Sequence, residues 1–144
     1  MDKQLVSNFY FENYTIENIS FQYNNNFDND EVNIEIETEI DFEIDTDINK
    51  GKVIIKMLLW DNAKKDNKPF RLEISISGIF SADDEMEEEE FTSMCKYNAV
   101  SILFPFLRSA ITDVTKIANI TPLVIPLINI QQFVEKNLVK KEND

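Results

Sequence analysis

Apolar and polar residues alternate without a break along one long stretch of this chain. From residue 32 to residue 48 every even position is apolar or threonine, and every odd position from Glu31 to Asp47 except Asn33 is acidic. Successive side chains of a β-strand point to opposite faces, so this stretch predicts a strand with one apolar and one anionic face. As a single strand it would extend roughly 55 Å, far beyond the usual length, and a bend or an interruption is expected.

Three further segments, 13–23, 52–61 and 70–80, predict strands from their β-branched and aromatic residues. Gly51 falls in the turn before the second of these segments and is predicted to supply a positive φ angle there. Gly78, near the end of the last segment, indicates a β-bulge or a close approach of the backbone. Four strands joined by short connections predict an antiparallel meander.

Residues 87–118 follow the period of a helix. Apolar residues before Pro105 point in nearly every direction, and Phe104 and Phe106 flank the proline. A helix that is apolar all round must be covered on more than one side. We therefore expect Pro105, which removes one helical hydrogen bond, to bend the helix so that this part contacts both its own sheet and a neighbouring subunit.

The next segment, 120–128, is apolar but contains Pro122 and Pro126, which exclude a helix interior and a central strand. It is predicted to cross the molecule in an extended form. Asn129 and Gln132 have the spacing of a capping box and predict a last short helix.

The predicted fold class is therefore α+β. A four-stranded antiparallel sheet is backed by a long proline-kinked helix and a short C-terminal helix. The expected organisation is a single domain over residues 1–144, with short polar tails outside a core of about 14–138.

Charge and composition narrow the partners and the compartment. The net charge of −13 and the pI near 4.3 argue against nucleic acid and anionic lipid as direct partners, because like charges repel each other. One cysteine allows no intramolecular disulfide and indicates a reducing compartment. The N-terminus lacks the apolar core of a signal peptide, and no stretch approaches the roughly 20 apolar residues that span a bilayer. A cytoplasmic protein without membrane insertion is expected.

Composition also excludes most kinds of catalytic, metal and phosphate-binding site. The chain has no histidine, which excludes Ser-His, Cys-His and His-metal arrangements, and two glycines cannot build a phosphate-binding loop. The carboxylates of the alternating strand lie about 6.6 Å apart in a row and do not converge on a metal ion. No pair of acids stands out as a catalytic pair. The chain is expected to be neither an enzyme nor a cofactor-binding protein.

Two features leave alternatives open. The anionic strand face is either a solvated surface or a docking site for a basic protein partner, and an acidic interaction protein that imitates nucleic acid is a further possibility. The apolar segment 123–128 is either covered by the protein's own core or forms a binding groove.

Several motifs, in their order and spacing, resemble those of the bacterial protein-export chaperone family SecB. "SGIF" at residues 77–80 and "ILFPFLR" at residues 102–108 are similar to the family's "GGIF" and "ILFPYAR", and "YTIENISF" at residues 14–21 is similar to its first strand. The resemblance implies a homotetramer built as a dimer of dimers. It also implies an ATP-independent holdase that keeps unfolded polypeptides and preproteins export- or folding-competent and passes them to the motor SecA.

The resemblance further implies long apolar grooves for client peptides, bounded by the crossing segment, the last helix and the sheet. The corresponding residues here are Phe27, Leu123, Val124, Ile125, Leu127, Ile130, Phe133, Val134 and Leu138.

Docking of SecA is implied on the outer sheet surface. The matching positions are Glu35, Glu37, Glu39, Glu73, Asn18 and Gln22. Glu73 retains an acid of the family, but Asn18 and Gln22 stand where the family's first strand commonly carries acids, and the C-terminal tail is short. SecB-like chaperones that hold the antitoxin of a toxin–antitoxin pair are therefore the alternative.

Overall fold

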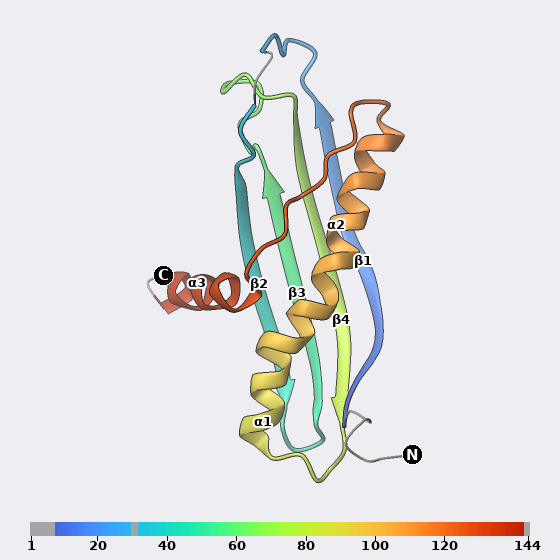
Figure 1. Cartoon of the computed structure of the whole chain (residues 1–144), viewed down its shortest axis with the longest axis vertical. Coiled ribbons are helices and arrows are strands. Elements are labelled where there is room, and N and C mark those ends of the chain that lie inside the picture. The colour runs from blue at the N-terminus through green and yellow to red at the C-terminus, as the bar shows by residue number, and fades with distance from the viewer. Residues whose placement is uncertain (1–7, 30–31, 143–144) are drawn as a thin grey trace.

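The computed structural model describes residues 8–29 and 32–142, so most of the predicted N-terminal tail and the end of the C-terminal tail lie outside the described residues. Figure 1 shows a sheet with all helices on one face. The elements are β1 (Phe9–Tyr23), β2 (Ile36–Asp45), β3 (Lys50–Leu59), β4 (Phe70–Ala82), α1 (Glu88–Ser93), a π-helical turn η2 (Met94–Asn98), α2 (Ala99–Ile117) and α3 (Ile130–Glu142).

The predicted four-stranded antiparallel sheet is confirmed, with one difference in the place of its first strand. The strand order is β1-β4-β3-β2, and each neighbouring pair is antiparallel. Strands β2, β3 and β4 form the meander, whereas β1 lies beside β4 at the far edge. Among the described residues, β1 and β2 each have one edge without a neighbouring strand.

The alternating stretch forms β2, but over fewer residues than its pattern covers. The regular strand spans residues 36–45, with its even positions turned toward the helices and its odd positions exposed. Residues 32–35 precede the strand as extended chain, and residues 46–48 belong to the turn. The expected interruption is therefore a shortening at both ends, and Glu31 lies outside the described residues.

The prediction of a positive φ angle at Gly51 needs correction. The residue with a positive φ angle in the β2–β3 turn is Asn49, at 47°, while Gly51 lies in β3 with a negative φ. Asn49 is suited to this conformation because its amide ties the turn to the next loop, donating hydrogen bonds to the carbonyls of Asp83 and Met86. Gly78 sits in regular register, and the bulges lie in β1 instead, at Phe11/Asn13 and Ile16/Asn18.

Gly78 marks a close approach between the sheet backbone and a helix. This is one of the two alternatives that the sequence predicted for it. A Cβ atom at this position would lie 2.6 Å from Leu103 Cδ2 of α2. The glycine therefore lets the long helix pack directly on the centre of the sheet. The core between these two layers is fully buried and includes Val53, Ile55, Met57, Leu59, Leu72, Ile74, Ile76, Leu103, Leu107 and Ile111.

The long helix contains Pro105, as predicted, and has a further irregularity before it. α2 continues through Pro105, and the departure from α-helical hydrogen bonding is the π-helical turn η2 before it. Pro105 has no N–H group, so the carbonyl of Ser101 has no helical hydrogen-bond partner. Both residues are exposed, and water can therefore satisfy that carbonyl. Phe104 is buried, whereas Phe106 is exposed.

The extended crossing segment and the last helix are confirmed. Residues 120–129 have no regular secondary structure and run back across the sheet to α3, which lies over β2 (Figure 1). The Oδ1 atom of Asn129 accepts a hydrogen bond from the backbone N–H of Gln132 at 3.0 Å, which is the predicted helix cap. Among the helices described, none is long and apolar enough to cross a membrane.

Candidate functional site

Polar side chains of α2 hold the crossing segment in place. Arg108 Nε donates a hydrogen bond to the carbonyl of Ile125 at 2.7 Å, and Thr112 Oγ1 donates one to the carbonyl of Leu123 at 2.8 Å. The backbone N–H of Leu123 in turn donates to Thr115 Oγ1 at 2.9 Å. An extended segment with two prolines cannot satisfy its backbone groups by itself, so these contacts fix its path.

The three anchoring residues were not recognised from the sequence. Arg108, Thr112 and Thr115 are spaced by four and three residues and therefore share one face of the helix. That polar row, next to a proline-containing apolar segment, is the signal that could have identified them. Because they take up the polar groups of the backbone, the side chains of the crossing segment remain free for apolar contacts.

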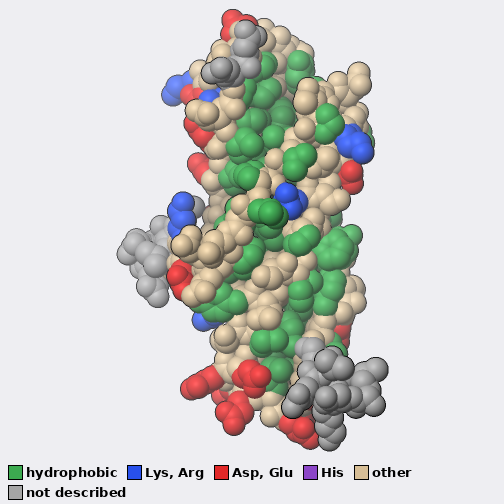
Figure 2. All heavy atoms as spheres, in the orientation of Figure 1, with side chains coloured by type: hydrophobic (Ala, Val, Ile, Leu, Met, Phe, Trp, Pro, Cys, Tyr) green, Lys and Arg blue, Asp and Glu red, His purple; other side chains and the backbone are tan. Residues whose placement is uncertain are grey.

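A cleft of about 490 Å³ opens between the start of the crossing segment and the end of the sheet. Figure 2 shows apolar side chains gathered on this helix-bearing face. The cleft is lined mostly by apolar and aromatic side chains from five parts of the chain: Tyr23, Phe27, Asn29, Val32, Ile34, Trp60, Pro69, Phe70, Ile120, Thr121, Pro122 and Leu123.

Two buried aromatic residues form the rigid part of the cleft. The rings of Trp60 and Phe70 meet edge to face with centroids 4.9 Å apart. Trp60 has a φ angle of 50°, and its indole N–H donates to the carbonyl of Asn33 at 3.0 Å. The hydrogen bond also attaches the extended chain before β2 to the cleft. Neither Trp60 nor Phe70 was singled out as a site residue, because an isolated strand-end tryptophan is most often part of a core.

The predicted client-binding residues do not all line one groove. Phe27 and Leu123 line the cleft and are partly buried. Val124 and Leu127, on the outside of the crossing segment, are 63% and 84% exposed. Ile125 is completely buried beneath that segment and belongs to the core.

The predicted residues on α3 are also divided between surface and core. Val134 is completely buried, and the ring of Phe133 packs against Phe104 of α2 with centroids 5.9 Å apart. Ile130 and Tyr97 line one shallow hollow. Leu138 lines a second hollow, and Tyr97 also forms part of its lining. These residues therefore line other hollows than the cleft.

The predicted docking residues share the outer face of the sheet but lie at opposite edges. Asn18 and Gln22 belong to β1, whereas Glu37 and Glu39 belong to β2, and β4 and β3 lie between them. Strands are spaced about 4.8 Å apart, so these groups are roughly 14 Å apart across the sheet. Glu35 lies just before β2, with its carboxylate 4.0 Å from the ammonium of Lys68.

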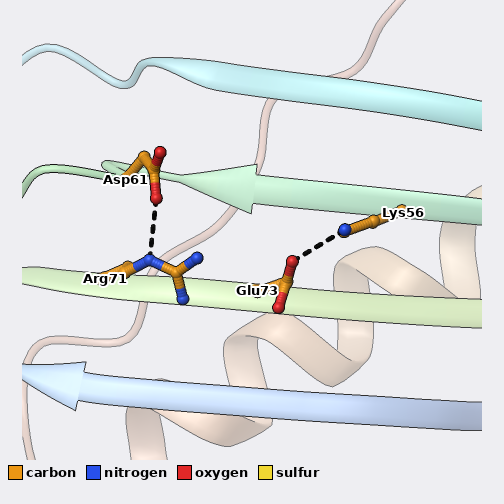
Figure 3. Close-up of polar contacts among 4 residues, drawn as sticks. All are labelled: Lys56, Asp61, Arg71 and Glu73. Carbon is orange, nitrogen blue, oxygen red and sulfur yellow. Dashed lines mark hydrogen bonds and ion pairs between the residues drawn. The ribbon is translucent and has the colours of Figure 1, made fainter.

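Glu73, the acid at the centre of this face that matches one in the family, is paired with a lysine. Figure 3 shows Glu73 with an oxygen 2.9 Å from the ammonium of Lys56, and Arg71 bonded to Asp61 at 3.0 Å. The hydrogen bond with Lys56 lowers the pKa of Glu73 below its ordinary value of 4.5. The same bond raises the pKa of Lys56 above 10.5. The middle of the outer face therefore presents paired charges rather than free carboxylates.

An exposed aromatic cluster lies along the edge strand β1 on the helix side. Tyr14 and Phe106 stack with ring centroids 4.3 Å apart, and both are more than one-third exposed. Ile19 and Tyr23, further along β1, are about half exposed. Large apolar residues beside an open strand edge are typical of a contact surface.

The described residues contain no group of three or more acidic or cysteine side chains that could hold a metal ion. Cys95, the cysteine of the chain, is completely buried, and desolvation raises the pKa of its thiol to about 11. Cys95 therefore belongs to the core rather than to the surface.

The fold and the apolar surface agree with those of the proteins to which the chain is similar. The sequence profile of the family described as preprotein translocase subunit SecB matches residues 2–141. The chain belongs to the SecB family. The protein-export protein SecB of Anaplasma phagocytophilum is 40% identical over 73 residues, which are 49% of this chain and 46% of that protein. The matched stretch thus spans about half the length of this SecB relative.

Two other comparisons cover nearly the whole fold. An uncharacterized protein of Methanocaldococcus jannaschii is 31% identical over 143 residues, covering 93% of this chain and 92% of the relative. The SecB-like chaperone of Mycobacterium tuberculosis, solved in complex with an antitoxin peptide, superposes with a TM-score of 0.67 at 16% identity. That match covers 85% of this chain and 91% of the solved one, and it establishes the shared fold.

Proposed function

We propose that this SecB-family chain is an ATP-independent holdase that binds unfolded polypeptides on its helix-bearing face. The observation that carries the proposal is the open cleft of about 490 Å³, lined by aromatic and aliphatic side chains and closed on one side by the crossing segment. Such a surface accepts apolar side chains of many shapes without requiring a particular hydrogen-bonding pattern. Its expected place of action is the cytoplasm.

The separate apolar areas suit a client that binds as a long chain. The cleft at one end, exposed Val124 and Leu127 on the crossing segment, and the hollows beside α3 are several weak sites. Each buried apolar area contributes about 25 cal/mol per Å². Sites engaged at once by one client reinforce each other through a high effective concentration, so that weak local contacts give tight overall binding.

The open β1 edge and its aromatic cluster support self-association, as expected of a homotetramer built from two dimers. The uncharged Asn18 and Gln22 reduce the charge along β1, which favours two copies of this strand lying side by side. Exposed Tyr14, Ile19 and Phe106 would then be covered by the partner.

Two candidate partners are SecA, the motor that receives clients, and an antitoxin, which would be held as a client. The antitoxin suits this surface better. The central acid of the outer face is paired with Lys56, and β1 carries amides where an anionic docking site would need carboxylates. The relative that shares the fold was solved with an antitoxin peptide, which supports the same class of client here. Delivery of preproteins to SecA remains the second candidate.

Light scattering combined with client capture tests the proposal. The purified chain is mixed with a permanently denatured polypeptide and, separately, with the folded form of the same protein, without ATP. A stable complex with the denatured chain alone is the expected result. Phe27→Ser at the cleft should weaken capture several-fold, whereas Ile48→Ser, which removes an exposed apolar residue from the β2–β3 turn, should not. Equal capture of folded and denatured protein would contradict the proposal.

The same assay separates a holdase from an acidic interaction protein that imitates nucleic acid. Neutralising the Glu and Asp side chains of β2 should leave capture of an uncharged apolar client intact. Complete loss of all binding in that variant would instead assign the function to the anionic strand.

A further inference from the structure

A second pocket, of about 270 Å³, adjoins the cleft at the same end of the sheet. Tyr23, the last residue of β1, is half exposed and lines both hollows. Phe70 of β4 lines the cleft, whereas its neighbours Arg71 and Gln22, which are paired across β4 and β1, line the pocket. Consecutive residues of a strand point to opposite faces, so the pocket continues the cleft around the end of the sheet onto its outer face.

Positive charge predominates in this pocket, although the chain as a whole is strongly acidic. Its lining includes the cations Lys64, Lys65 and Arg71 and one acid, Asp61, which leaves an excess of two positive charges in a chain of net charge −13. We call it the cationic pocket. Charges more than about 8 Å away are largely screened at physiological ionic strength. An anionic group in the pocket therefore experiences these cations more strongly than the acids elsewhere on the molecule.

The two lysines are not neutralised by the protein itself. Both are exposed in the loop between β3 and β4. Neither has a carboxylate within 4.0 Å among the residues that the structure describes. Their ammonium groups are therefore available to a bound anion.

A buried asparagine holds the backbone of this loop in place. Asn24, which is 2% exposed, donates hydrogen bonds from Nδ2 to the carbonyls of Ala63 at 3.3 Å and Lys68 at 2.9 Å. Within the loop the N–H of Lys68 donates to the carbonyl of Ala63 at 2.8 Å. The backbone that carries Lys64 and Lys65 is thus ordered before a ligand binds, which reduces the entropy cost of binding.

Arg71 is oriented by a hydrogen bond that uses one corner of its guanidinium. The Nε atom donates to Asp61 Oδ1 at 3.0 Å (Figure 3). The planar guanidinium has further N–H donors on its two Nη atoms, and this geometry suits a carboxylate. Glu73, two residues further along the same face, is bonded to Lys56 at 2.9 Å and does not depend on Arg71 as a partner.

We propose that the cationic pocket binds an Asp or Glu carboxylate of a held segment whose adjoining apolar residues lie in the cleft. This inference rests on the proposed holdase function and names the class of segment that this end of the molecule prefers. The Nη groups of Arg71 and the ammonium groups of Lys64 and Lys65 supply the charge-assisted contacts.

Continuity with the cleft favours a held segment over a second copy of this chain as the occupant. A segment whose apolar residues already lie in the cleft presents its next residues to the pocket at a high effective concentration, because Tyr23 lines both hollows. A second copy would instead bring another net charge of −13 toward the first, and the two molecules would repel each other.

The probes are two fluorescent peptides of about twelve residues, roughly 40 Å when extended, that differ only in charge. Each has a central block of Phe and Leu flanked on both sides by two Glu residues in one peptide and by two Gln residues in the other. Their affinities for the full chain are measured by anisotropy at low and high salt. The test variant is K64Q/K65Q, and the control K50Q/K136Q removes the same charge from exposed lysines outside the pocket.

We expect the unmodified chain to bind the Glu peptide roughly fivefold more tightly than the Gln peptide, although the net charge alone would give the opposite order. The preference should disappear in K64Q/K65Q, persist in K50Q/K136Q and decrease with added salt. Arg71→Lys should weaken it, because lysine keeps the charge but lacks the planar fork.

Carbodiimide coupling, which joins a carboxylate directly to an amine, locates the bound Glu residues. Mass spectrometry should find the Glu peptide attached to Lys64 or Lys65. Tighter binding of the Gln peptide by the unmodified chain, a preference that K64Q/K65Q retains, or coupling at other lysines alone would overturn the proposal. A changed oligomeric mass of K64Q/K65Q with an unchanged peptide preference would assign the pocket to a second copy and would also contradict it.

The uncharged Gln peptide separates this inference from the function on which it rests. If the unmodified chain binds both peptides equally, the holdase function stands and only the cationic pocket is rejected. If it binds neither peptide and captures no denatured client, the holdase function itself is rejected.

Discussion

The hydroxyl of buried Thr115 accepts a hydrogen bond from the backbone N–H of Leu123 at 2.9 Å and donates one to the carbonyl of Thr112 at 2.8 Å. Through this contact, the last turns of α2 determine where the crossing segment begins its path over the sheet. The position of the cleft thus depends on a helix residue that does not line it.

Thr115→Val should destabilise the fold by about 1–3 kcal/mol, because it keeps the shape of the side chain but leaves the N–H of Leu123 without an acceptor. Urea unfolding measures the loss, and hydrogen exchange should show faster exchange at Leu123. The exposed Thr121→Val is the control and should be neutral. Equal stabilities for the two variants would exclude Thr115 as an anchor.

Gly78→Ala should cost about 1–3 kcal/mol through overpacking, since the added methyl carbon would lie 2.6 Å from Leu103. Thermal or urea unfolding of Gly78→Ala, Leu103→Ala and the double variant forms a complete cycle. Removing the leucine side chain relieves the contacts with Leu103 and leaves the one with Phe80 Cε2 at 2.8 Å, so the double variant should lose less stability than the two single losses combined. Additive losses would show that α2 does not depend on this close approach.

The Lys56–Glu73 pair should give a pH dependence with a defined sign. The lowered pKa of Glu73 means that its contribution to stability is present above the ordinary Glu pKa of 4.5 and is lost as the pH falls through the lowered value. The raised pKa of Lys56 means that its contribution is present below 10.5 and is lost as the pH rises through the raised value. Because both groups face solvent, added salt should reduce the effect.

Carboxyl NMR titration measures this pair directly. The pKa of Glu73 should lie below 4.5 in the unmodified chain and return toward it in Lys56→Gln. Lys50→Gln, also on β3, is the matched control and should leave the pKa of Glu73 unchanged. A Glu73 pKa that does not respond to Lys56→Gln would rule out their pairing in solution.

Cys95 should resist thiol reagents in the folded protein at neutral pH. Its side chain is completely buried, and desolvation raises the thiol pKa to about 11, so the reactive thiolate is scarce. Colorimetric thiol titration should detect the cysteine only after denaturation. Rapid reaction of the native protein would mean that the packing of η2 against the sheet opens readily.

Much of the fold follows from periodicity in the sequence. The strict alternation before residue 48 predicts both faces of β2, and the side chain of Asn129 caps α3 as its spacing with Gln132 predicts. Local patterns of this kind reflect local geometry, so they survive in the structure. The prolines at 122 and 126 likewise predict an extended crossing segment because their effect is steric and local.

The remaining features depend on contacts between distant residues. The pairing of β1 with β4 is not encoded in either strand alone, and a meander was the simpler expectation. Asn49 rather than Gly51 adopts the left-handed conformation because its amide finds acceptors in a loop more than thirty residues away. Ile125 and Val134 have the same apolar character as Val124 and Leu127, so only the packed structure separates core from surface.

The unequal edges of the sheet determine how far an assembly of this chain can extend. A sheet in which β1 of one copy paired with β2 of the next would repeat without limit and form a ribbon. The carboxylates of β2 disfavour repeated β2–β2 contact, whereas the proposed pairing of two β1 strands is symmetric and closes on itself. If two copies pair through β1 as proposed, that edge is used up after two chains, and the charge on β2 gives the joined sheet a defined end.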